Sequence, residues 1–295
     1  MGIERQHFVA QGFLTGFSTP DARTNKFVWL YRKDRKWKPK RRSVKSVAWQ
    51  SFYYEQETEA GARDTDTLER AFAESVDRVV PDIIRSLDAK PGLTASLSPM
   101  DQGALAFFIG ISLARVPSFR EPIRDIHTRI AQRALKSAVE HDVKLKDFVE
   151  THGVTAEAKP WVSLQPMMQL AQMVSQSALE KNWQFFVPPQ DVALVTSDNP
   201  VIFDVARSYG IDSAGPAHPL AELVINLRKD LALVCTPRRG EPTCAVFQMT
   251  RDEAWKFNRG IIRAAQLSVF APIQSAEIDQ LVKDHIGQHH TLVLD

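Results

Sequence analysis

The spacing of hydrophobic and polar positions changes along the chain and divides it into three predicted parts. In the first part, residues 26–31 and 46–54 are rich in Val, Trp, Tyr and Phe, which are common in strands. They flank a basic segment at 32–45 that contains Pro39, a residue whose missing N–H costs least at a hairpin tip. The simplest arrangement is an N-terminal β-hairpin with a long basic tip.

The second part predicts a block of helices, because apolar residues recur near the helical period. The amphipathic stretches cover residues 67–88, 121–141 and 164–181. A further helix begins with Ser98 as N-cap and Pro99 in the first helical position. It runs to Arg115, is apolar nearly all round, and is expected to end at Pro117. We therefore expect it to be the central buried helix, and we expect residues 141–161 to be irregular.

The third part consists of short apolar runs separated by turn residues, a pattern typical of strands. These runs lie at residues 185–187, 192–195, 201–203, 223–225, 231–234, 245–247 and 267–270. Two helices are predicted among them, one capped by Thr250 and running to about residue 265, the other at 275–286. The order predicts the α+β class: an N-terminal β-hairpin, a central helical block with one buried helix, and a C-terminal part of mainly antiparallel strands plus two helices.

The length of 295 residues fits a single domain, within which 1–182 and 183–295 would be two lobes. Neither a signal-peptide pattern nor an apolar run of about 18 residues occurs, so we expect a cytoplasmic protein without a membrane segment. Cys235 and Cys244 favour two buried thiols, although they could also face each other across a hairpin. The net charge of +2 excludes neither anionic nor cationic partners, so local clusters must decide.

The first candidate functional residues are His7 and Gln11, which lie among regularly spaced aromatic and aliphatic residues. Because they are four positions apart, they would share a face on a helix. The imidazole could act as a general acid or base, with the amide orienting it. The alternative is a buried histidine whose hydrogen bonds only stabilise the core.

A second candidate lies between two apolar runs, in the sequence Thr-Ser-Asp-Asn-Pro-Val at 196–201. One interpretation is a turn in which Asp198 and Asn199 hydrogen-bond nearby backbone groups. Another, compatible with the first, is a carboxylate held rigidly at a strand end, where it could orient a base or bind a divalent metal ion. Ser197 does not belong to a serine-nucleophile motif, because the Gly-x-Ser-x-Gly pattern is absent.

Two arginines, Arg115 and Arg120, follow the predicted buried helix. An arginine so close to an apolar helix must be paired or must face a cavity, because burying an unpaired charge is costly. Both could therefore clamp a phosphate or carboxylate. The alternative is a structural ion pair with Glu69 or Glu74 of the preceding helix.

The basic segment has nine Lys or Arg residues between Arg32 and Lys45, interleaved with an indole. Clustered positive charge binds phosphates, and an indole can stack on a base. The residues expected to contact nucleic acid are Arg35, Lys36, Trp37, Lys38, Lys40, Arg41 and Arg42. The alternative is a solvated loop, and no helix-turn-helix, zinc-finger or RNP motif accompanies the segment.

Several of these motifs occur in the same order as in an uncharacterised bacterial family, a domain of unknown function, which this chain resembles over most of its length. The family opens with His-aromatic-Val-Pro-x-x-aromatic-Leu-x-x-Phe and later carries an aromatic-Tyr pair, an acidic helix, Arg-x-Pro-x-x-Arg and Ser-Asp-Asn-Pro-Val. The matching positions are 7–17, Phe52 with Tyr53, Glu69, 115–120 and 197–201. Ala10 stands where the family usually has Pro. The resemblance implies no activity, but it implies that the polar motif residues belong together.

These observations lead to the hypothesis of a bacterial hydrolase that acts on the phosphodiester bonds of nucleic acid, of the toxin or phage-defence type. His7, with Gln11 beside it, would be the acid–base group, and Asp198 would orient it or bind a metal ion. The expected substrate contacts are Arg115, Arg120, Asn199, Tyr53 and Glu69. The alternative is a non-catalytic polyanion-binding or protein-interaction module in which these residues are structural, and a small-molecule hydrolase is a third option.

Overall fold

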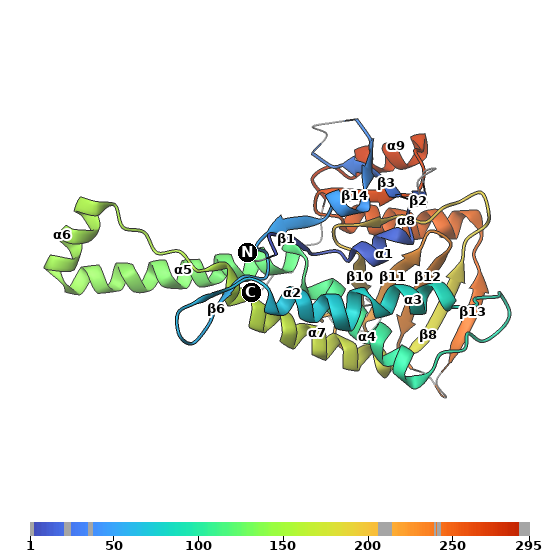
Figure 1. Ribbon diagram of the computed structural model, residues 1–295, viewed down its shortest axis with the longest axis horizontal. Coiled ribbons are helices and arrows are strands. Elements are labelled where there is room, and N and C mark those ends of the chain that lie inside the picture. Colours follow the sequence, from blue (N-terminus) through green and yellow to red (C-terminus); the bar gives the residue numbers. More distant parts are fainter. Residues whose placement is uncertain are drawn as a thin grey trace.

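The computed structural model describes residues 3–20, 25–34, 38–205, 214–238, 240 and 243–288. It confirms the α+β class. Helices from the middle of the chain cover one face of a five-stranded sheet, and a second sheet carries the N-terminal hairpin (Figure 1). One pair of helices projects from this body as an arm.

The main sheet has the strand order β10-β11-β12-β8-β13. Its strands are β8 Asn182–Val187, β10 Val201–Asp204, β11 Glu222–Arg228, β12 Leu231–Thr236 and β13 Cys244–Gln248. Neighbours are antiparallel except β13 and β8, which run parallel. In β12, Leu231 and Leu233 pack with the helical block, whereas Ala232 packs with Ala254 of α8 (Arg251–Ala264). Because both faces of β12 are covered, its sequence is apolar from Leu231 to Cys235.

The second sheet confirms the N-terminal hairpin but gives it a different second strand. The elements of this region are β1 Arg5–His7, β2 Thr19–Pro20, β3 Lys26–Arg32, β4 Lys40–Ser43, the 3-10 turn η1 Val44–Ser46, β5 Trp49–Ser51, β9 Thr196–Ser197 and β14 Ser268–Ala271. β3 pairs with β4 inside the basic segment, whereas residues 46–54 supply β5, which pairs with β1. Ala48 and Phe52, at φ 55° and 53°, bound β5, because a strand cannot continue through positive φ.

The central buried helix is α4 (Pro99–Ala114), as its apolar sequence predicted. Ser98 caps it by accepting a hydrogen bond from an N–H of the first turn at 3.1 Å. α4 packs closely on α7 (Leu164–Leu179), where a Cβ added at Gly110 would lie 2.2 Å from the Ala171 carbonyl oxygen. The approach of the two backbones therefore requires glycine at this position.

The stretch expected to form one helix is divided into three pieces. The pieces are α2 Thr67–Phe72, the π-helical turn η2 Ala73–Asp77 and α3 Val79–Ser86. A short helix, α1 Gln11–Thr15, packs on them. Pro81 contributes to the division, because it has no N–H to donate to the Asp77 carbonyl. Gly12 of α1 approaches this carbonyl, and a Cβ there would lie 2.8 Å from its oxygen and 2.5 Å from Cγ of Pro81.

Two helices form the arm that extends away from the body (Figure 1). α5 (Pro117–His141) begins earlier than expected, because proline fits the first turn of a helix. α6 (Val143–His152) corrects the expectation that residues 141–161 are irregular. Asp142 caps α6 by accepting hydrogen bonds from two N–H groups of its first turn, and Gly153 ends it at φ 60°.

The remaining elements are β6 Gln56–Glu57, β7 Arg63–Asp64, the 3-10 turn η3 Pro160–Ser163 and α9 Ala276–Asp284. The two predicted C-terminal helices are thus α8 and α9. Thr250 and Glu253 form the reciprocal capping box that begins α8. One hydrophobic cluster includes Phe8, Phe108 and Phe270, so it draws on both lobes considered from the sequence.

Cys235 and Cys244 are free thiols. They lie on β12 and β13, the two strands that flank β8, and both are opposite Trp183. Two strand spacings, about 10 Å, therefore separate them. Because disulfides need Cα atoms within about 7 Å, this arrangement corrects the alternative of two cysteines facing each other across a hairpin.

Within the described residues, no helix by itself has the length and apolar character needed to cross a bilayer. The pair α4 and α5 meets that criterion jointly, with a bend of 52° between them.

Candidate functional site

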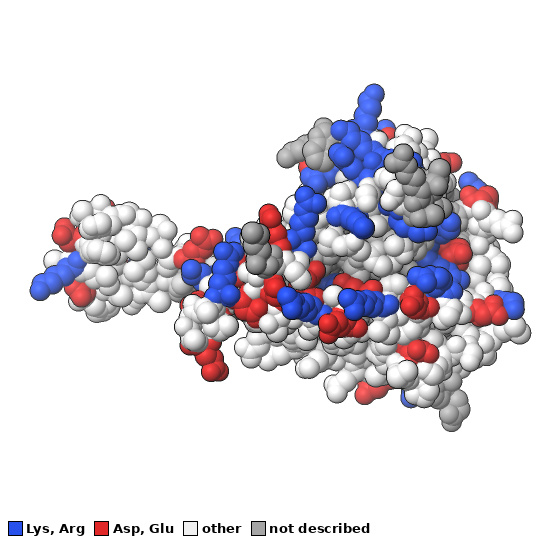
Figure 2. Space-filling model, viewed as in Figure 1, with Lys and Arg blue, Asp and Glu red and all other residues white. Residues whose placement is uncertain are grey.

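The β3–β4 hairpin is strongly cationic. Lys38, Lys40, Arg41 and Arg42, called here the hairpin cations, are all exposed. Figure 2 shows Lys and Arg gathered over this part of the molecule. The guanidinium of Arg41 lies 4.3 Å from the ring centroid of Phe27, so that side chain is held on one face of the hairpin.

Beside the hairpin lies a cavity of about 610 Å³, called here the Trp49 cavity. Buried Phe8 and Phe270 contribute to its apolar wall, and Arg32 and Arg42 also line it. The guanidinium of Arg32 is paired with Asp34 at 2.6 Å. The indole of Trp49 is half-buried and completes one side. Glu121 and Asp198 line the same cavity, so the part of it that suits a flat, negatively charged ligand is the side formed by Arg42 and the indole.

The backbone of the Trp49 cavity is strained at Ala48, a non-glycine residue at φ 55°. Its carbonyl accepts a hydrogen bond from the Phe8 N–H at 3.0 Å, which holds the turn in place. The guanidinium of Arg5 lies 4.7 Å from the Trp49 ring centroid and fixes the indole from one side. Strained residues of this kind cluster at functional sites.

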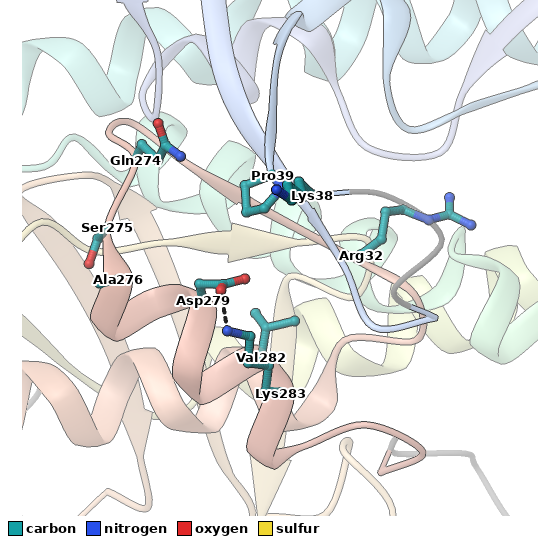
Figure 3. A pocket seen from close by; sticks show the side chains of 9 residues that line it. All are labelled: Arg32, Lys38, Pro39, Gln274, Ser275, Ala276, Asp279, Val282 and Lys283. Carbon is teal, nitrogen blue, oxygen red and sulfur yellow. Dashed lines mark ion pairs between the residues drawn. The ribbon is translucent and has the colours of Figure 1, made fainter.

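A second cavity, of about 520 Å³, lies on the other side of the hairpin and is called here the α9 cavity (Figure 3). Arg32, Lys38 and Asp279 are among its lining residues. Asp279 pairs with Lys283 at 2.6 Å, and Figure 3 shows Arg32 pointing away from that pair. Because Arg32 lines both cavities, the two lie next to each other along the hairpin.

Asp198 lies in the turn between β9 and β10, at the wall of the Trp49 cavity, and its carboxylate holds the turn before β14. Its Oδ1 accepts a hydrogen bond from the Gln266 N–H at 2.9 Å, and Oδ2 accepts from Leu267 and Ser268 at 2.8 and 2.7 Å. Burial raises the pKa of Asp198 to about 6, although these three hydrogen bonds oppose the rise. Asn199 donates to the Ala264 carbonyl at 3.2 Å, so both residues also fasten the end of α8.

Lys33 is buried behind this turn. Its ammonium donates to the carbonyls of Ile262, Arg263 and Ala265 at 3.1, 3.1 and 2.7 Å. A cation at the C-terminal end of α8 interacts favourably with the unpaired carbonyls there. Burial lowers the pKa of Lys33 to about 8, and the charge of Asp198 opposes that change.

His7 and Gln11 are in contact, as the sequence predicted. The Gln11 amide lies 3.2 Å from Nδ1 of His7, so the amide donates and the neutral ring carries its proton on Nε2. The Tyr54 hydroxyl donates to the His7 carbonyl at 3.0 Å. Burial lowers the pKa of His7 to about 4, which keeps the ring neutral near pH 7.

Glu69, Asp77 and Arg115 continue this buried polar cluster. Nη1 and Nη2 of Arg115 lie 3.2 and 3.3 Å from Oδ1 of Asp77. The π-helical turn that ends at Asp77 sets this geometry, and such turns are frequent at functional sites. Burial and the nearby Asp77 charge raise the pKa of Glu69 to about 7. A carboxyl group with that pKa can take up or release a proton near neutral pH, whereas the His7 ring stays neutral there.

Arg120 is buried in a different setting. Its guanidinium donates to the Ser163 hydroxyl at 2.9 Å, to the Tyr53 carbonyl at 2.5 Å and to the Pro160 carbonyl at 3.3 Å. It also lies 4.1 Å from the Tyr53 ring centroid. These contacts join the residues after β5 to η3, so they account for Arg120 without a ligand.

The family comparison adds to this geometry. The model of a family described as a protein of unknown function (DUF4238) matches residues 5–275. The chain belongs to the DUF4238 family. This confirms the resemblance to an uncharacterised family. No curated protein and no solved structure matches the chain.

In this DUF4238 protein the predicted site residues fall into separate groups. His7, Gln11, Glu69 and Arg115 share one buried cluster. The contacts of Asp198 are instead with the turn before β14, so the structure does not bring it into that cluster. Of the residues expected to bind nucleic acid, four are the hairpin cations, while Arg35, Lys36 and Trp37 lie outside the described residues.

The sequence did not point to two residues of the candidate sites. Trp49 was assigned to a hairpin strand, and Asp77 was not considered as the partner of Arg115. The Asp77 contact depends on the π-helical turn, which ordinary helical spacing does not predict. Across the part of the chain that the structure describes, no group of three or more His, Cys, Asp or Glu side chains could hold a metal ion.

Proposed function

We propose that this DUF4238 protein binds nucleic acid through the hairpin cations and the Trp49 cavity. The observation that carries the proposal is that Arg42 and an indole line one cavity beside an exposed basic strand. Phosphate contacts supply affinity that depends on charge alone, and stacking on an aromatic ring supplies contact with a base.

Strand geometry supports this division of roles. Arg42 is opposite Val28 and Lys40 is opposite Leu30 in the β3–β4 ladder. Alternate residues of a strand share a face, so these two cations lie on the side of Leu30, which lines the Trp49 cavity. A phosphate held by Arg42 would place the attached nucleoside near the indole.

The first experiment measures binding of fluorescently labelled RNA and DNA strands by anisotropy. Arg41→Glu/Arg42→Glu is expected to weaken binding at least tenfold, because it reverses two phosphate contacts. The matched control is Arg78→Glu/Arg85→Glu, which makes the same charge change at exposed positions outside the hairpin and the arm. Equal loss in both variants, or no binding by the unmodified protein at low salt, contradicts the proposal.

A phosphodiester hydrolase is the second candidate function, and it is favoured by Asp198 at the wall of the same cavity. A carboxyl group with a pKa of about 6 can accept a proton near neutral pH. Cleavage of the labelled strands, measured with Mg²⁺, with Mn²⁺ and with EDTA, should disappear in Asp198→Asn while binding persists. If the unmodified protein binds the strands but does not cleave them, the binding function stands and the hydrolase function is contradicted.

A further inference from the structure

Among the described residues, the arm buries little against the body of the protein. At its base, Arg124 pairs with Glu157 at 3.8 Å and the Thr128 hydroxyl accepts a hydrogen bond from the Ala158 N–H at 3.1 Å. In α5 the buried residues end at Ile123, and α6 has none. Residues 124–141 extend roughly 27 Å from the body at the rise of an α-helix. Most of the stability of a protein helix comes from tertiary packing, so a pair of helices in which no residue from 124 to 152 is fully buried would be stabilised by a further surface to pack against.

The arm has an inner face and an outer face. Leu135 and Val139 of α5 and Leu145 and Val149 of α6 are half-buried, as expected where the two helices meet. The outer face carries a stripe at spacing four, Ile130, Ala134 and Ala138, all exposed. Ile130 is 58% exposed. Small and aliphatic residues at this spacing suit close packing of another helix.

Charge is divided along the length of the arm. The stem, residues 124–136, carries four basic side chains and one acidic one. The tip, residues 137–152, carries four acidic side chains and two basic ones. A second arm running in the opposite direction would therefore meet basic stem with acidic tip at both ends.

We propose that the arm is a dimerisation element that binds the arm of a second copy of this chain in antiparallel orientation. A two-fold interface must be complementary to itself, and the stem-to-tip division of charge has that property. The Ile130 stripes of the two copies pack against each other, and the two helix pairs form a four-helix bundle. The proposed partner is a second copy of this chain, because a second arm already carries the charge pattern that complements the first.

The test measures the mass of the full-length protein in solution by sedimentation, across protein concentrations and without nucleic acid. The unmodified chain is expected to dimerise. Arg129→Glu/Arg133→Glu in the stem and Glu140→Lys/Asp147→Lys in the tip should each raise the dimer dissociation constant at least tenfold. Combining all four substitutions makes the stem acidic and the tip basic, so the two are complementary again. The dimer dissociation constant should return to within threefold of that of the unmodified protein.

Two controls make the outcome specific to the arm. Arg41→Glu/Arg42→Glu makes the same charge change on the hairpin and should leave the dimer unchanged. Circular dichroism of each variant should show equal helix content at a concentration at which all are monomeric. A chain that remains monomeric at every concentration overturns the proposal, and so does a dimer that neither reversal weakens or that the four-fold variant fails to restore.

Discussion

At the scale of single residues, the buried polar cluster makes stability depend on pH. The pKa of His7 is about 4 when folded, below its ordinary value of 6.5. The unfolded chain therefore binds a proton that the folded chain does not between pH 6.5 and 4, and stability falls as pH falls through that window. We predict that His7→Asn, which cannot take up this proton, reduces the acid-induced loss by up to about 3 kcal/mol. Denaturant unfolding at pH 7, 5.5 and 4.5 measures it. If the free energy of unfolding of the variant falls with pH as steeply as that of the unmodified protein, the lowered pKa of His7 is contradicted.

Glu69 should have the opposite effect. Its pKa of about 7 when folded is above the ordinary value of 4.5, so the folded chain holds a proton that the unfolded chain has released. Stability is therefore lost as pH rises from about 4.5 to 7. We predict that Glu69→Gln raises the free energy of unfolding at pH 8 by about 1–2 kcal/mol, a value reduced for partial exposure of the carboxyl. Glu74→Gln, at an exposed position of the next helical turn, should leave it unchanged. Equal effects of the two substitutions at pH 8 contradict this account.

The same residues show how much of the candidate site could be predicted from the sequence. The contact between His7 and Gln11 was predicted from their spacing of four, yet His7 belongs to β1 and Gln11 begins α1. The chain turns sharply between them, so the contact arose for another reason. For Arg115 the alternatives were an anion clamp and a structural ion pair with Glu69 or Glu74; the structure shows an ion pair, but its partner is Asp77, which the π-helical turn brings within reach. Local geometry of this kind leaves no mark on hydrophobic periodicity.

At the scale of helices and strands, the contact of α4 with α7 gives the sharpest prediction. A Cβ at Gly110 would lie 2.2 Å from a backbone oxygen of α7, and a backbone atom cannot move aside as a flexible side chain can. We predict that Gly110→Ala destabilises the protein by about 2–3 kcal/mol. Gly103→Ala in the same helix meets nothing within 4 Å and should stabilise by up to about 1 kcal/mol. Chemical unfolding of both variants checks this, and the same sign for both contradicts the packing described.

Elements with a strong, uninterrupted pattern were predictable. The cap at Ser98 and the apolar sequence after it predicted α4, and the cap at Thr250 predicted α8. The second strand of the hairpin was misplaced, because exposed Lys and Arg residues form β4 while the apolar residues near Trp49 are divided by two left-handed positions. Helix α6 was missed because it buries no residue, so it has little hydrophobic periodicity to detect.

At the scale of the whole molecule, nucleic-acid binding should depend on salt. If the four hairpin cations each contact a phosphate of a single strand, the logarithm of the binding constant should fall with the logarithm of salt concentration with a slope of about −3. In Arg41→Glu/Arg42→Glu the slope should be much shallower, because two contacts are lost. Anisotropy titrations between 50 and 300 mM salt (roughly the range over which such contacts are lost) measure both slopes. A slope near zero for the unmodified protein contradicts a role for phosphate contacts.

The most direct test of the account is to locate the bound strand. A single strand that carries photoreactive 5-iodouracil is cross-linked to the full-length protein by ultraviolet light, and the modified peptides are identified by mass spectrometry. The account predicts cross-links at Trp49 and in the β4 peptide, because the proposed site places a base beside that indole. Cross-links confined to the arm or to the outer face of α7 would contradict nucleic-acid binding at the hairpin.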